Sequence, residues 1–300
     1  MILVFSNFFS PKLGLFFHAV CGHTNSPAEA GLGSDKIMNA KVISFINMKG
    51  GVGKTTVAVN LAYELASTRN KKVLLVDMDP QFNATQLCFS RFARIEEYDN
   101  VQKQGTTIAG ILLSNSDFTS ESKVNIRDTI FNLAPNLDLI PGDLRLTNFE
   151  SSVRGSEKLL DEQLQLVKDK YDLIFIDTPA TYSIYSQASL LASGFYIVPM
   201  MPDMFAALGY SLLQNKMKRD PIIKNLNLIN LGIVVNLWSE KKVGRQRILE
   251  DLSAENIFNT KISQYEVNRT GTGRTLMSDR QLNSKDIKDL ANELLDKLQK

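Results

Sequence analysis

A glycine-rich loop with two lysines is the stretch of this sequence whose residue types and spacing most directly predict chemistry. It reads INMKGGVGKTTVAVN over residues 46–60. Consecutive backbone N–H groups in such a loop can surround phosphate oxygens, because glycine lacks the Cβ that would block their approach. A helix that begins near Lys54 would direct the positive end of its dipole at the same anion. These features predict a nucleotide-binding loop.

Two side chains that follow the glycines have the chemistry that a nucleoside triphosphate requires. Lys54 would supply charge to the β- and γ-phosphates, and the Thr55 hydroxyl is placed to bind Mg²⁺. The loop fits the pattern G-x-x-x-x-G-K-[ST] only in part, because Met48 stands where the first glycine would be. Binding needs one lysine, so Lys49 requires a separate explanation. The nucleotide contacts expected from this loop are Lys49, Gly50, Gly51, Val52, Gly53, Lys54, Thr55 and Thr56.

A strand before the loop and a helix after it must position these residues, and the surrounding pattern predicts both. Short apolar runs alternate with longer helical stretches, which favours an α/β fold with a mostly parallel central sheet and helices on both faces. We expect strands over 41–47, 71–77, 137–141, 171–177, 194–200, 228–236 and 260–265. We expect helices over 53–67, 157–170 and 284–299, whereas residues 78–135 are polar and irregular, with helical pieces that cannot be placed.

Polar residues end three of the expected strands, at the sheet edge where open α/β folds bind their ligands. Asp77 ends the strand 71–77 and is expected to hold local structure. Asp177 ends the strand 171–177, where a carboxylate can hold Mg²⁺ through water. Asn236 ends the strand 228–236, and asparagine at such a place is also an ordinary turn former.

These motifs resemble those of the ParA/MinD ATPases, which carry a deviant Walker A loop. KGGVGKTT is similar to the signature loop, VDMDPQFNAT (76–85) looks like the ParA-type motif that follows it, and YDLIFIDTPA (171–180) resembles the Walker B segment. The resemblance covers roughly residues 41–300 and implies a P-loop NTPase of the SIMIBI type that hydrolyses ATP with Mg²⁺. Two positions depart from the pattern: Phe82 replaces the glycine usual after Asp-Pro-Gln, and Ala180 stands where a second proline is common.

The resemblance also implies roles for individual residues. Lys54 would be the in-subunit catalytic lysine, and Lys49 would be the signature lysine that reaches the partner's nucleotide in an ATP-sandwiched dimer. Asp79 would position the attacking water and is a second candidate to contact the metal, and Asn236 would contact adenine. An electrostatic argument agrees for Lys49, because two triphosphates packed face to face concentrate negative charge that a second lysine per subunit would offset.

A local surplus of basic residues lies in a chain whose formal charge is only +2. Residues 216–247 hold eight Lys or Arg against Asp220 and Glu240. The resemblance implies a homodimer that binds double-stranded DNA without sequence preference, for which lysines and arginines on one face suffice. A centromere-binding, ParB-like partner would stimulate hydrolysis and release, and so segregate a plasmid. A solvated basic face is the alternative. The DNA-binding candidates are Lys216, Lys218, Arg219, Lys241, Lys242, Arg245, Arg247, Arg269 and Arg274.

A MinD-like positioning ATPase that acts on a membrane surface is the alternative function. Such a protein should end in a basic amphipathic helix. The expected helix 284–299 carries acidic residues that balance its lysines, and core packing explains its apolar stripe better. We therefore expect no membrane partner. The stripe consists of Ile287, Leu290, Leu294 and Leu298.

Two further relatives of the fold lack their key residues here. An enzyme of the nitrogenase-reductase type needs cysteines to hold a cluster between subunits, and Cys21 and Cys88 cannot supply them. A tyrosine autokinase would carry a C-terminal tyrosine cluster, and no tyrosine follows Tyr265. So few cysteines, without C-x-x-C spacing, favour a reduced, cytoplasmic chain.

Residues 1–37 differ in composition from the rest, with an apolar, aromatic part followed by a small, polar part. Pro11 and Lys12 interrupt the apolar run, so neither a signal peptide nor a membrane helix is favoured. We expect an appendage or an upstream translation start before a single P-loop ATPase domain over 38–300, with a packing arm as the alternative. This organisation resembles the small ParA type without an N-terminal DNA-binding domain, which implies association with the nucleoid.

Overall fold

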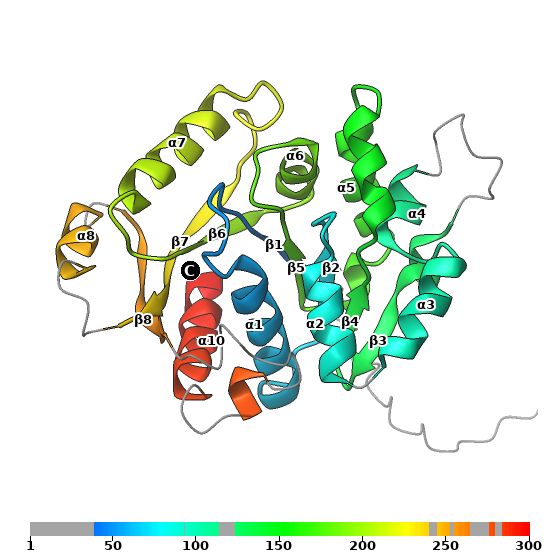
Figure 1. Cartoon of the computed structure of the whole chain (residues 1–300), viewed down its shortest axis with the longest axis horizontal. Helices are drawn as coiled ribbons and strands as arrows, with labels where there is room; N and C mark the ends of the chain where they lie inside the picture. The colour runs from blue at the N-terminus through cyan, green and yellow to red at the C-terminus, as the bar shows by residue number, and fades with distance from the viewer. Residues whose placement is uncertain are drawn as a thin grey trace, which may run out of the picture. The chain divides into compact units, whose positions relative to one another are not determined.

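An eight-stranded sheet forms the centre of the unit Ile37–Lys300 in the computed structural model (Figure 1). The structure describes residues 39–92, 94–113, 124–239, 245–252, 255–264, 276–279 and 284–300, so the expected extension 1–37 lies outside it. The strand order is β3-β4-β2-β5-β1-β6-β7-β8. The strands are β1 (Lys41–Phe45), β2 (Val73–Asp77), β3 (Phe131–Ala134), β4 (Leu137–Ile140), β5 (Leu173–Asp177), β6 (Phe195–Met200), β7 (Ile229–Trp238) and β8 (Ile257–Ser263).

All neighbouring strands pair in parallel except β3 and β4, which are antiparallel, so the predicted mostly parallel sheet is confirmed. The α-helices are α1 (Lys54–Thr68), α2 (Asn83–Arg91), α3 (Ile95–Lys103), α4 (Ile108–Leu113), α5 (Leu159–Gln165), α6 (Ile184–Leu191), α7 (Ala206–Arg219), α8 (Arg245–Asp251) and α10 (Ser284–Gln299). The 3₁₀ segments are η1 (Ile126–Thr129), η2 (Leu144–Ser151), η3 (Ser156–Lys158), η4 (Lys168–Lys170) and η5 (Met277–Asp279).

Helices cover both faces of the sheet. Successive side chains of a strand point to opposite faces, so a strand that is apolar throughout needs helices on both faces to bury its side chains. In β5, Phe175 packs into one core with residues of α1, α2 and α10. Its neighbours Ile174 and Ile176 pack into a second core with residues of α4, α5 and α6. A third core joins β6 and β7 to α7. Burial on both faces explains why the central strands read as continuous apolar runs.

The last helix, α10, packs against α1 and β8 and buries its apolar stripe. Ile287, Leu290 and Leu294 have no exposed surface, and Leu298 is 7% exposed. Burying one such side chain stabilises the fold by about 1.5–3 kcal/mol, so this face belongs to the core, as expected. Among the described residues, no helix has the length and apolarity that crossing a bilayer requires.

Two local expectations were wrong. The helix expected over 157–170 is interrupted: α5 ends at Gln165, because Val167 turns out of helical geometry (φ −135°) while its side chain is buried. The strand β3 lies in a stretch expected to be irregular. It has four residues and an irregular register with β4, so it is too short to show an alternating pattern.

Candidate active site

The glycine-rich loop connects the end of β1 to the start of α1. Gly51 (φ 71°) and Gly53 (φ 87°) adopt the left-handed conformation, which glycine accepts without steric cost. A Cβ added to Gly53 would overlap the Nδ2 atom of Asn236. Position 53 therefore requires glycine for two reasons: its left-handed backbone conformation, and the side-chain amide of Asn236 that occupies the space of a Cβ.

We predict that Gly53→Ala weakens ATP binding at least about tenfold, because the Cβ must displace Asn236 and strain the loop. A titration with a fluorescent ATP analogue measures the effect. Gly209→Ala is the control, since a Cβ at this position of α7 meets nothing within 4 Å. An unchanged affinity for Gly53→Ala would contradict this account of the loop.

Lys54 and Thr55, in the first turn of α1, lie beside a buried carboxylate at the end of β5. Thr55 Oγ1 donates to Asp177 Oδ2 at 2.6 Å. Burial raises the pKa of Asp177 well above its ordinary value. Burial also lowers the pKa of Lys54, and the nearby Asp177 carboxylate opposes that change. A cation beside Asp177 and an anion beside Lys54 would each stabilise the charged form of the neighbouring group.

The cluster contains a polar atom that the protein itself leaves unsatisfied. Asp177 Oδ1 and Asn236 Oδ1 are buried without a hydrogen-bond partner, and no other side-chain atom of the described part of the chain is in that state. Buried oxygens of this kind normally have partners. With the hydroxyl of Thr55, the free carboxylate oxygen offers the hard oxygen ligands that Mg²⁺ prefers. These residues therefore fit a magnesium-bound triphosphate.

Asp77, the last residue of β2, and Asp79, two residues later, have different surroundings. Asp77 is fully buried and accepts hydrogen bonds from Thr85 N at 2.8 Å and from Thr85 Oγ1 at 2.7 Å. It also accepts one from Asp79 N at 3.2 Å, and burial raises its pKa to about 7. Asp79 lines the cavity in front of the glycine loop. Asp77 therefore holds the segment together through these hydrogen bonds, whereas Asp79 lies at the cavity wall.

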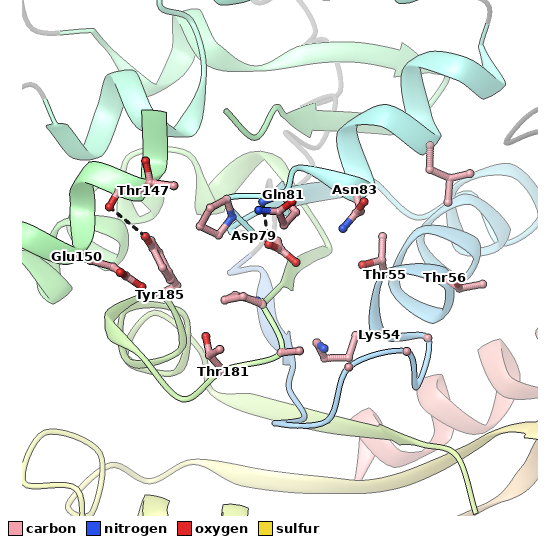
Figure 2. A pocket seen from close by; sticks show the side chains of 17 residues that line it. Lys54, Thr55, Thr56, Asp79, Gln81, Asn83, Thr147, Glu150, Thr181 and Tyr185 are labelled. Carbon is pink, nitrogen blue, oxygen red and sulfur yellow. Dashed lines mark hydrogen bonds between the residues drawn. The ribbon is translucent and has the colours of Figure 1, made fainter. Parts of the chain in front are cut away.

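This cavity has a volume of about 780 Å³, which is enough for a nucleotide (Figure 2). Figure 2 shows Lys54, Thr55 and Thr56 on one side and Thr147, Glu150 and Tyr185 on the other. Sequence reasoning missed the second side. Thr147 and Glu150 come from the 3₁₀ segment η2, whose sequence has no motif that could reveal them. The remaining lining residues are Gly50, Gly51, Gly53, Asp79, Pro80, Gln81, Asn83, Leu87, Pro179, Ala180 and Thr181.

Three residues expected at the nucleotide do not line this cavity. Val52 is buried, and its carbonyl accepts a hydrogen bond from Asn236 Nδ2 at 2.8 Å. Asn236 therefore supports the loop from behind while its Oδ1 atom stays unpaired. The ammonium group of Lys49 pairs with the carboxylate of Asp203, in the loop after β6. Asp203 was not predicted, although its place just beyond the carboxyl end of a strand is a usual one for site residues.

The candidate DNA-binding residues are only partly brought together. Lys216, Lys218 and Arg219 are exposed in the last turn of α7, where positive charge also favours the helix dipole. Arg247 is exposed on α8, which lies well away from that turn in Figure 1. The side chain of Arg245 and the residues Lys241, Lys242, Arg269 and Arg274 lie outside the described residues.

Comparison with known proteins places the fold and the glycine loop together in one family. Residues 40–229 match the family described as AAA domain. The chain is 33% identical over 261 residues to the virulence plasmid ParA family protein pGP5-D of Chlamydia psittaci, covering 84% of this chain and 92% of that protein. It is 30% identical over 224 residues to the chromosome-partitioning ATPase Soj of Treponema pallidum, covering 73% and 81%.

A solved structure has the same architecture. The plasmid partition protein of Borrelia burgdorferi bound to AMPPNP superimposes with a TM-score of 0.72 at 28% identity. The match covers 86% of this chain and 99% of that one. The two chains therefore share the same fold over most of their length.

Proposed function

The chain belongs to the ParA family of partition ATPases, and from this membership we propose that it acts as an ATP-sandwiched dimer that binds DNA with ATP and releases it after hydrolysis. It is an ATPase that uses ATP and Mg²⁺. The observation that carries the proposal is the cluster of Lys54, Thr55 and Asp177 at the glycine loop, with a buried carboxylate oxygen left free.

Each part of the cluster would take one part of the substrate. The loop N–H groups and Lys54 would bind the phosphates, and Thr55 and Asp177 would hold Mg²⁺, the latter through water. Bound Mg²⁺ offsets negative charge on the phosphates. The free Oδ1 atom of Asn236 would accept a hydrogen bond from the adenine amino group.

Hydrolysis would then depend mainly on positioning, because phosphoryl transfer demands little covalent chemistry from the protein. Asp79 would orient the attacking water from the wall of the cavity that it lines. A carboxylate can accept a hydrogen bond from that water and aim its oxygen at the γ-phosphate.

Lys49 would act on the nucleotide of the partner subunit. Lys49 does not line the cavity of its own chain. Instead, its ammonium group forms an ion pair with Asp203 outside that cavity. To reach a second active site, the lysine must leave Asp203. Its charge would then stabilise the transition state in trans, in the manner of an arginine finger.

DNA would bind to the basic residues of the dimer without sequence preference. The exposed Lys216, Lys218 and Arg219 of α7 support this, together with the basic surplus of the whole segment 216–247. A ParB-like protein at the centromere would stimulate hydrolysis, so that the dimer leaves the nucleoid and the plasmid moves. The buried stripe of α10 argues against the MinD-like alternative, since that face is not free to enter a membrane surface.

We predict that the purified protein retains nonspecific DNA with ATP and Mg²⁺ but not with ADP or without nucleotide. A filter-binding or gel-shift experiment measures retention in the three states, and sedimentation measures dimerisation in parallel. Liposomes of anionic lipid form the second arm. DNA retention that does not depend on nucleotide, or binding to the liposomes instead, would overturn the proposal.

A charge variant locates the DNA surface in the same experiment. Lys216→Ala, Lys218→Ala and Arg219→Ala together should weaken DNA retention and flatten its salt dependence, because each phosphate contact contributes roughly 0.9 to the logarithmic slope. ATP hydrolysis without DNA should stay unchanged. The matched control replaces Lys285, Lys288 and Lys300, which are exposed in or just after α10. Equal losses for both variants would show that only total charge matters.

A further inference from the structure

Phe82, three residues after Asp79, has a backbone conformation that a side chain disfavours. Its φ of 42° and ψ of 40° lie in the left-handed region, where a Cβ approaches the following carbonyl oxygen. In the ParA-type motif that this segment resembles, glycine is usual at this position. Phe82 therefore adopts a backbone conformation that glycine would adopt without strain. Contacts with other residues must stabilise Phe82 in that conformation.

The backbone of Phe82 connects the Asp79 segment to α2. Phe82 N donates to Asp79 O at 2.8 Å, and Gln86 N donates to Phe82 O at 3.0 Å. Phe82 also occupies the N-cap position of α2. A change of φ at Phe82 would thus break the turn that begins at Asp79 or shift it relative to the helix. The place of the Asp79 carboxylate in the cavity depends on this one residue.

The ring of Phe82 is held by Tyr98 of α3. The two rings stack with centroids 5.7 Å apart and planes 22° from parallel. Tyr98 is itself fixed, since its hydroxyl donates to Gly142 O at 2.9 Å and its ring meets Phe89 edge-on at 5.5 Å. The backbone of Gly142 lies close to Phe82, because a Cβ added at position 142 would come within 2.7 Å of the Cβ of Phe82.

We propose that Tyr98 is a positioning residue for Asp79 and acts through the stacked ring of Phe82. The inference rests on the proposed role of Asp79 in hydrolysis. Tyr98 does not line the cavity, and α3 buries none of its residues completely. The stacking of Phe82 on Tyr98 stabilises the left-handed backbone of Phe82 relative to other conformations. The position of the Asp79 carboxylate therefore depends on where α3 places Tyr98.

Kinetics of four variants test this dependence. Tyr98→Ala should lower kcat about tenfold, because Phe82 relaxes out of the left-handed region once the stack is gone, while KM for ATP stays within about twofold. Tyr98→Phe keeps the ring and should stay within about threefold of the wild-type kcat. Phe82→Gly should do the same, because glycine adopts this backbone without a stack. The double variant Phe82→Gly/Tyr98→Ala should match Phe82→Gly alone.

Rescue by glycine is the deciding result. If the double variant is as slow as Tyr98→Ala, Tyr98 acts on the fold of α3 and not through Phe82, and the proposal is wrong. An unchanged kcat for Tyr98→Ala would also overturn it.

Hydrogen exchange separates this proposal from the role of Asp79. Tyr98→Ala should increase exchange at the amides of residues 81–86 whether or not Asp79 takes part in hydrolysis, and Phe82→Gly should restore protection in the double variant. Asp79→Asn tests the other point: normal hydrolysis in that variant would refute the catalytic role of Asp79. Unchanged exchange in Tyr98→Ala would refute the proposal that Tyr98 holds the Asp79 segment through Phe82.

Discussion

Lys54→Ala should reduce ATP affinity at least about a hundredfold, which is the expected cost of losing charge-assisted hydrogen bonds in a buried site. Lys54 is only 7% exposed and lies beside Asp177. The other residues of the first turn of α1 are Thr55, Thr56 and Val57, which carry no charge that could replace it. Titration with a fluorescent ATP analogue measures the loss, and hydrolysis should fall with it.

Lys158→Ala is the control for that variant, since Lys158 is exposed in a 3₁₀ segment that does not line the cavity. Circular dichroism should show that both variants keep their helices and strands. A Lys54→Ala variant that binds ATP with wild-type affinity would remove this lysine from the proposed phosphate site.

Lys49→Ala should differ from Lys54→Ala in that ATP binds normally, while kcat falls about a hundredfold or more, as for a charge supplied in trans. The lysine pairs with Asp203 outside the cavity of its own chain, so its loss leaves the contacts of the bound nucleotide intact. Affinity and single-turnover hydrolysis measure the two effects separately. An equal loss of affinity in Lys49→Ala and Lys54→Ala would contradict the division of labour.

Mixing inactive variants tests whether the lysine acts across a dimer. Equal amounts of Lys49→Ala and Asp79→Ala should recover about a quarter of the wild-type rate, because half of the dimers are mixed and each then holds one intact site. Two inactive variants that remain inactive when mixed would show that Lys49 acts in its own subunit.

Asp203→Asn should keep hydrolysis and reach its half-maximal rate at a lower protein concentration, because the loss of the Asp203 carboxylate frees Lys49 from its ion pair.

The nucleotide loop could be predicted from sequence because its chemistry is local. Glycines, Lys54 and Thr55 are neighbours along the chain, and the strand and helix beside them have strong patterns. Asp177 could be predicted as well, since the ends of parallel strands meet at one edge of the sheet.

The contacts that could not be predicted join distant segments without a motif. Lys49 and Asp203 are separated by 154 positions, and no spacing rule connects them. The stack of Phe82 on Tyr98 depends on where α3 packs relative to the segment after β2. Both lie in the stretch 78–135, whose helices could not be placed from the sequence. The departure at Phe82 was visible in the sequence, but its left-handed backbone was not, because phenylalanine rarely adopts it.

The free oxygens of Asp177 and Asn236 have a consequence for the stability of the fold. Each buried oxygen without a partner costs the folded state about 1–3 kcal/mol, and a ligand that supplies the missing contacts returns that energy to the folded chain alone. The nucleotide would thus add to the stability of the chain as well as serve its activity. With less nucleotide bound, a larger fraction of the molecules would unfold, so thermal denaturation should shift to higher temperature when ATP and Mg²⁺ are added.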